Sequence, residues 1–188
     1  MNGMANLLEQ LLNELKNRNL PSEIHECAII PSREVPFGEQ VRRACEANYC
    51  GCYGKYWTCP PGIGDWQMLE TKYKSYHFCF VYSTLHMLED SFDIDGMTQG
   101  KLDHNAVDLA VRDFFQKKGL SFAQLSTEGC HRCEKCTYPD APCRFPDKIT
   151  HSVEAAEIDV VSLSRHCEMH YINGMNTVTY FSAVFFTL

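Results

Sequence analysis

The alternation of apolar and polar positions predicts a chain of helices and short buried strands. Residues 5–18 carry leucines at helical spacing with glutamates on the other faces, which predicts an amphipathic helix that Pro21 ends. The clearest helix spans residues 103–118, because Asp103 stands where an N-cap is expected and Gly119 stands where a helix commonly ends. Further helices are expected at residues 38–47, 65–74 and 152–169.

Apolar runs bounded by Pro, Gly and polar residues predict the strands. They lie at residues 27–30, 77–85, 122–126 and 178–186. Strands that alternate with helices favour a small α/β layer structure with a four-stranded central sheet, flanking helices and connecting loops. A chain of 188 residues is long enough for one domain with a sizeable core.

Residues 88–100 are expected to form a loop. The segment Asp93-x-Asp95-Gly96 resembles part of a calcium-binding loop. An EF-hand loop in this register would need a bidentate glutamate at position 102, which is Leu102. We therefore reject a calcium site here.

The composition changes this picture through its cysteines, of which there are eleven. Four of them fall within fourteen residues as C-x2-C-x2-C-x6-C, namely Cys130, Cys133, Cys136 and Cys143. A buried cysteine packs as a small apolar residue and needs no neighbours of its own kind. Thiolates this close repel one another unless a cation holds them, so the spacing predicts a metal site.

The same spacing leaves two candidate metals. It resembles the bacterial ferredoxin run C-x2-C-x2-C-x3-C-P, although the last gap is longer, and this favours an iron–sulfur cluster. Structural zinc more often takes two separated C-x2-4-C pairs. Three thiols on one continuous turn suit the corners of a cube better than one tetrahedral ion, so we place a [4Fe–4S] cluster first and zinc second.

A second group of cysteines precedes the first in the chain and predicts another metal loop. It comprises Cys45, Cys50, Cys52 and Cys59. The one-residue gap in Cys50-Gly51-Cys52 is too short for both sulfurs to bind the same cluster easily. Cys45, Cys50 and Cys59 are therefore the stronger candidates, and Cys52 is expected to point away. Cys79, in the middle of a predicted strand, and Cys27 are expected to be core residues.

These motifs resemble an uncharacterised prokaryotic family known only as predicted metal-binding proteins. One signature matches Cys45-x4-Cys50, Tyr53-Gly54-Lys55, Trp57 and Cys59-Pro60-Pro61, and the other matches Gly129-Cys130-x2-Cys133-x2-Cys136, Cys143-Arg144-x-Pro146, Ser152-x-Glu154-Ala155 and Ile158-Asp159-Val160. The resemblance covers nearly the whole chain after residue 25. It implies that both cysteine groups are metal sites and supplies no reaction. The expected organisation is a single domain over 1–188, with an amphipathic helix in 1–20 and a metal-binding α/β domain in 25–188.

Two [4Fe–4S] clusters suggest electron transfer, as a carrier or as a redox subunit with a partner protein. The alternatives are a cluster-containing enzyme component with an open iron site, and a zinc-stabilised interaction module. Basic residues flank both groups and could tune the potential of a cluster: Arg42, Arg43 and Lys55 at one, and His131, Arg132, Lys135 and Arg144 at the other. Tyr53 and Trp57 are expected to shield the first group from water.

Charge and hydropathy exclude other classes. The formal charge of -7 argues against sequence-independent binding of nucleic acid. No apolar run is long enough for a membrane span, and the first residues do not resemble a signal peptide. So many cysteines without an export signal favour reduced thiols in the cytoplasm, and oxygen-sensitive clusters favour an anaerobic or microaerobic prokaryote.

Overall fold

The computed structural model describes residues 2–127, 130 and 132–188 of the chain. Its centre is a five-stranded sheet in the order β1-β2-β5-β3-β4. The strands are β1 (Glu26–Pro31), β2 (Phe78–Met87), β3 (Ser121–Ser126), β4 (His151–Ser152) and β5 (Thr177–Thr187). Neighbouring strands are antiparallel except β3 and β4, which are parallel. The mixed α/β class is confirmed, and the sheet has one strand more than expected because β4 pairs with the end of β3.

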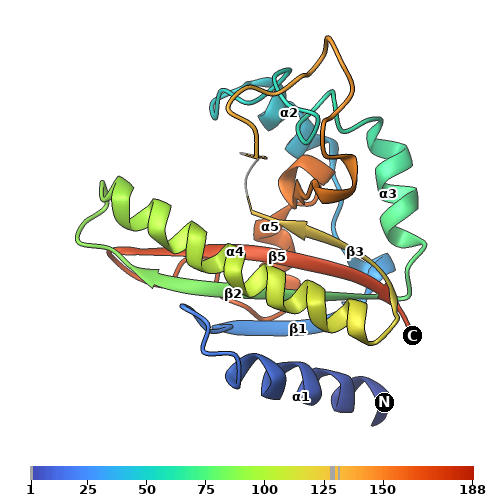
Figure 1. Cartoon of the computed structure of the whole chain (residues 1–188), viewed down its shortest axis with the longest axis vertical. Helices are drawn as coiled ribbons and strands as arrows, with labels where there is room; N and C mark the ends of the chain where they lie inside the picture. The colour runs from blue at the N-terminus through green and yellow to red at the C-terminus, as the bar shows by residue number, and fades with distance from the viewer. Residues whose placement is uncertain (1, 128–129, 131) are drawn as a thin grey trace.

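Helices cover both faces of this sheet (Figure 1). They are α1 (Asn2–Lys16), α2 (Glu39–Glu46), α3 (Trp66–Lys74), α4 (Ile94–Lys117) and α5 (Val160–His166). Helices α1 and α4 pack on one face, where Leu11 and Phe114 join one core cluster. Helices α3 and α5 pack on the other, where Tyr73 and Leu163 join a second cluster.

Alternation along the central strands builds both cores. In β2, Phe80 and Tyr82 face α1 and α4, whereas Cys79 and Val81 face α3 and α5. Successive side chains of a strand point to opposite faces, so a strand covered on both sides is apolar throughout. Cys79 is fully buried, which confirms that it is a core residue.

Helix α4 begins nine residues earlier than the sequence suggests, at Ile94 rather than Asp103. Asp93 is the N-cap and accepts a hydrogen bond from the backbone N–H of Gly96 at 2.7 Å. Much of the expected loop is therefore the first part of this helix, and the acidic segment caps it. Gly100 permits the helix to lie close to β2, because a Cβ there would stand 2.8 Å from Cγ of His86.

The expected helix at residues 152–169 is also wrong in its extent. Strand β4 and a 3-10 turn, η3 (Glu154–Ala156), precede α5, which is only seven residues long. Glu157 adopts a left-handed conformation with φ of 64°, which breaks the helical run. Asp159 then caps α5 by accepting from the N–H of Ser162 at 3.0 Å.

Candidate metal centre

The first cysteine group lies where α2 ends and the loop of residues 47–65 begins. Cys45 is on the last turn of α2, and Cys50, Cys52 and Cys59 follow in the loop. Gly51 and Gly54 have φ of 72° and 69°, in the left-handed region that favours glycine. These tight turns fold the loop back on itself and return Cys59 toward α2.

The thiols of this group lie within electrostatic range of one another. Burial first, and then the neighbouring thiols of Cys52, Cys50 and Cys45, raise the pKa of Cys59 to about 11, against a hydrogen bond with Thr58. The pKa of Cys45 is raised by burial and then by Cys50. Both thiols are neutral at pH 7 and would have to lose their protons to bind a metal.

Cys52 differs from expectation. The tight Cys50-Gly51-Cys52 segment suggests that its thiol points away from the group. In the structure Cys52 is the thiol with the largest electrostatic effect on Cys59. Its Sγ also donates to the backbone oxygen of Cys50 at 3.6 Å. The positive φ of Gly51 turns the chain between the two cysteines, which spacing alone cannot reveal.

The second cysteine group lies in the loop between β3 and the 3-10 turn η2 (Pro146–Lys148). Cys130, Cys133, Cys136 and Cys143 all line one cavity. The guanidinium of Arg144 donates to the backbone oxygen of Lys135 at 2.9 Å and ties the two arms of the loop together. The spacing thus predicted a set of thiols that the fold does bring around one space.

The two cysteine loops pack against each other at one end of the domain, at the top of Figure 1. The backbone N–H of Cys130 donates to Oγ1 of Thr58 at 3.2 Å. The indole N–H of Trp57 donates to the backbone oxygen of Ala141 at 3.1 Å, and its ring meets Tyr138 edge-on at 4.9 Å. Trp57 therefore lines the second group rather than shielding the first.

The thiols approach one another without converging on a single point. Within residues 2–127, 130 and 132–188, no three His, Cys, Asp or Glu side chains lie close enough together to hold one metal ion. The cavity of the second group is about 20 Å³, the space of one water. Separated thiols suit the corners of a cluster, whereas the small cavity suits a single ion unless the loop widens. The donor set, four thiols in each group, fits either cofactor.

Two of the basic residues near the first group, Arg42 and Arg43, are paired with carboxylates. Arg42 donates from Nη1 to Oε1 of Glu157 at 2.5 Å, and Arg43 pairs with Glu39 at 3.1 Å on the surface. Arg42 still lowers the pKa of Cys45 slightly, as the weakest of several influences that on balance raise it. Among the residues near the second group, His131 lies outside the described residues, as do Gly129 of the second signature and Glu128 before it.

Glu157 is a buried carboxylate beside the first group that sequence reasoning missed. It is fully buried, and its Oε2 has no hydrogen-bond partner among the described residues. Burial raises its pKa despite the opposing effect of Arg42. The negative charge of Glu157 raises the pKa of Cys45. A charged residue inside the apolar run Ala155-Ala156-Glu157-Ile158 was the signal that could have identified it.

The remaining cysteines and histidines do not join these groups in the described part of the chain. Cys167 packs against the core around Cys79, and burial raises its pKa to about 11. His166 and His170 are exposed and pair with Glu34 and Glu26 at 3.2 and 2.7 Å. They are surface residues.

Comparison with known proteins identifies the family. No curated protein and no solved structure matches the chain. No helix among the described residues is both long and apolar enough to cross a membrane. The model of the family described as "Predicted metal-binding protein (DUF2284)" matches residues 28–186. That match includes every cysteine of both groups, and the chain therefore belongs to this family of predicted metal-binding proteins.

Proposed function

We propose that the protein carries two iron–sulfur clusters, one in each cysteine loop, and functions in electron transfer. The observation that carries the proposal is the packing of two four-cysteine loops against each other, with Thr58 of one loop bonded to Cys130 of the other. Cys45, Cys50, Cys52 and Cys59 would hold one cluster, and Cys130, Cys133, Cys136 and Cys143 the other. Thiolate-bound clusters supply one-electron chemistry when bound.

The residues around the loops support this role. Trp57, whose ring packs against Tyr138, lines the cavity of the second group and limits its contact with water, a factor that sets the potential of such sites. Arg132, Lys135, Arg144 and Lys148 are exposed around the same loop. Glu134, Asp140 and Asp147 are exposed in the same segment, so charges of both signs are available to contact a redox partner at this end of the domain.

A zinc-stabilised interaction module is the second candidate, because the cavity of the second group has room for little more than a single ion. The two proposals differ in redox behaviour. Anaerobically prepared protein, studied by voltammetry on an electrode, is expected to give reversible one-electron waves. Protein that holds only zinc gives no wave in the accessible range, because zinc has no redox chemistry.

Cys52 decides whether the first site is closed by local ligands. Because its thiol lies near Cys59, we expect Cys52→Ser to abolish the EPR signal of the first cluster and leave the second with the signal of a single, uncoupled cluster. Cys27→Ser, at a partly buried cysteine on the other side of the sheet, is the control and should leave both signals unchanged. An unchanged first signal in Cys52→Ser, which shifts when cyanide is added, would instead indicate an open iron and favour an enzyme component.

A further inference from the structure

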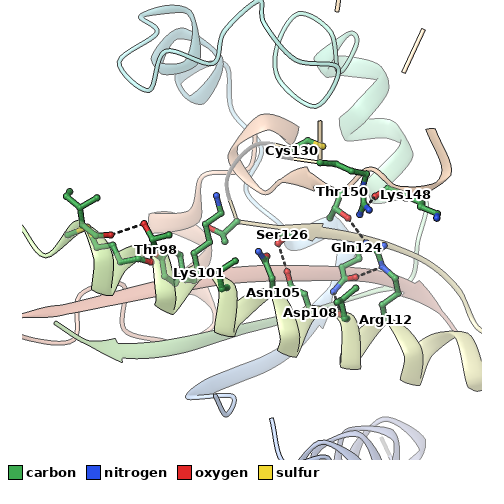
Figure 2. A pocket seen from close by; sticks show the side chains of 17 residues that line it. Thr98, Lys101, Asn105, Asp108, Arg112, Gln124, Ser126, Cys130, Lys148 and Thr150 are labelled. Carbon is green, nitrogen blue, oxygen red and sulfur yellow. Dashed lines mark hydrogen bonds between the residues drawn. The ribbon is translucent and has the colours of Figure 1, made fainter. Parts of the chain in front are cut away.

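A large cleft runs along helix α4 and reaches the second cysteine group. Its volume is about 960 Å³, at the upper end of the range for small-molecule sites. Helix α4 forms one side, and the end of β3 with Thr127, Cys130, Arg132, Lys148 and Thr150 forms the other (Figure 2). Cys130 lines both this cleft and the cavity of the second group. The cleft therefore opens directly beside the proposed metal site.

One face of α4 lines this cleft. Its lining residues recur at intervals of three and four from Ile94 to Arg112, which places them on one face over about 27 Å. The opposite face carries Val111 and Phe114 into the core. The cleft face is apolar toward its beginning, with Met97 and the exposed Leu102, and ends at the cationic Arg112.

The end of the cleft at Arg112 can hold a negative charge. Nε of Arg112 donates to Oε1 of Gln124 at 2.9 Å, and Nη2 donates to Thr150 at 2.5 Å. These bonds fix the plane of the guanidinium and use two of its five N–H donors. Figure 2 shows Arg112, Gln124 and Thr150 together at this end, with Lys148 close by.

Among the described lining residues, positively charged side chains outnumber negatively charged ones. Four are cationic, namely Lys101, Arg112, Arg132 and Lys148, and one, Asp108, is a carboxylate. Asp108 already accepts hydrogen bonds from the hydroxyls of Tyr82, Ser182 and Ser126. The described lining of the cleft thus carries more positive than negative charge, in a chain whose formal charge is -7, and this favours anions.

Buried hydrogen bonds fix the side chains behind the polar end of the cleft. His104, which is fully buried, bridges Thr84 and Ser182 at 2.8 Å each, and Ser182 donates to Asp108. Gln124 donates to the hydroxyl of Tyr82 at 2.9 Å and also holds Arg112. Satisfied buried networks of this kind lock side-chain positions. The cleft is thus preorganised at its polar end.

We propose that this cleft binds a small organic anion with an elongated apolar body. Arg112, with Lys148 and Arg132 beside it, binds the carboxylate or phosphate group. Leu109 and Leu102 contact the apolar body, and a longer body extends along the cleft toward Met97 and Ile94. The anionic group then lies on the side of the cleft that Cys130 shares with the metal site. This binding goes beyond the proposed electron transfer and does not depend on which metal the cysteines hold.

Calorimetric titration of the metal-loaded protein tests this proposal. The probes are octanoate, octyl phosphate, inorganic phosphate and octyltrimethylammonium, each below its micellar concentration. We expect saturable binding of at least one of the two octyl anions, weaker binding of inorganic phosphate and none of the octyl cation. Binding of only one octyl anion identifies its head group as the preferred one. Equal binding of the cation, or no binding of either octyl anion at millimolar concentration, overturns the proposal.

Substitutions locate the site. Arg112→Gln is expected to weaken binding of the octyl anion by at least about tenfold, as loss of a charged hydrogen bond does. Lys148→Gln, at an exposed position, should weaken it several-fold. Leu102→Gln, also at an exposed position, should weaken binding of the octyl anion more than binding of inorganic phosphate. Arg33→Gln removes an equal charge from an exposed site outside the cleft and is the matched control. If Lys148→Gln and Arg33→Gln bind the octyl anion with equal affinity, the anion does not bind in this cleft. The metal content of each variant is measured as well, because an unchanged metal content shows that a loss of binding does not come from damage to the metal site.

Discussion

Cys136→Ser is expected to remove the metal of the second site and leave that of the first. Cys136 lines the cavity that the four thiols of its group surround, so its loss leaves too few thiolates to hold a cluster. Binding of metal and folding of such loops are coupled. We therefore expect iron per chain to fall by about half and residues 132–150 to lose protection from hydrogen exchange. Metal analysis and exchange mass spectrometry measure the two effects.

Cys79→Ser is the matched control for this substitution. Cys79 is fully buried in β2, and burial raises the pKa of its thiol well above the usual value. The hydroxyl loses its water contacts in this apolar site, so unfolding free energy should fall by about 1–3 kcal/mol. Metal content should stay unchanged. Loss of metal from Cys79→Ser, or its full retention by Cys136→Ser, would contradict the division into ligand and core cysteines.

Arg42→Ala is expected to destabilise the protein by about 3–5 kcal/mol, the usual cost of removing one partner of a buried ion pair. The side chain of Arg42 is 16% exposed, and that of its partner Glu157 only 1%. Without Arg42, the carboxylate of Glu157 remains buried with its main compensating charge removed. Because α2 also carries Cys45, we expect the variant to lose the metal of the first site more readily. Urea unfolding, followed by far-UV circular dichroism, gives the stability.

Arg43→Ala provides the comparison on the same helix. Arg43 and Glu39 form an exposed pair, with side chains 72% and 62% accessible. Such pairs contribute about 0.3–0.5 kcal/mol. Nearly equal destabilisation by Arg42→Ala and Arg43→Ala would show that the buried pair does not hold α2 in place.

The strands were predictable because apolar runs covered on both faces leave a plain signal. Residues 77–85 and 178–186 are such runs, and they became β2 and β5. The start of α4 was not predictable, since Gly96 and Gly100 weaken helical propensity locally. Tertiary packing overrides that weakness: Gly100 lies against His86, and Asp93 caps the helix.

The candidate site was predictable in its ligands and not in its surroundings. Spacing alone grouped Cys130 with its three partners, which line one cavity. The contact of Thr58 with Cys130 joins residues 72 positions apart, and no local pattern encodes it. The cleft was missed for the same reason, because Asp108 and Ser126 come together only when α4 packs on the sheet.

The central claim, that the two cysteine loops hold iron–sulfur clusters, is tested most directly by metal and sulfide analysis of protein purified without oxygen. The protein is expected to be brown, with roughly eight iron and eight sulfide per chain, four of each in each cluster. Reduction with dithionite should produce EPR signals of two interacting clusters, because the loops are in contact. Colourless protein with stoichiometric zinc and no sulfide would contradict the account while leaving the same cysteines as ligands.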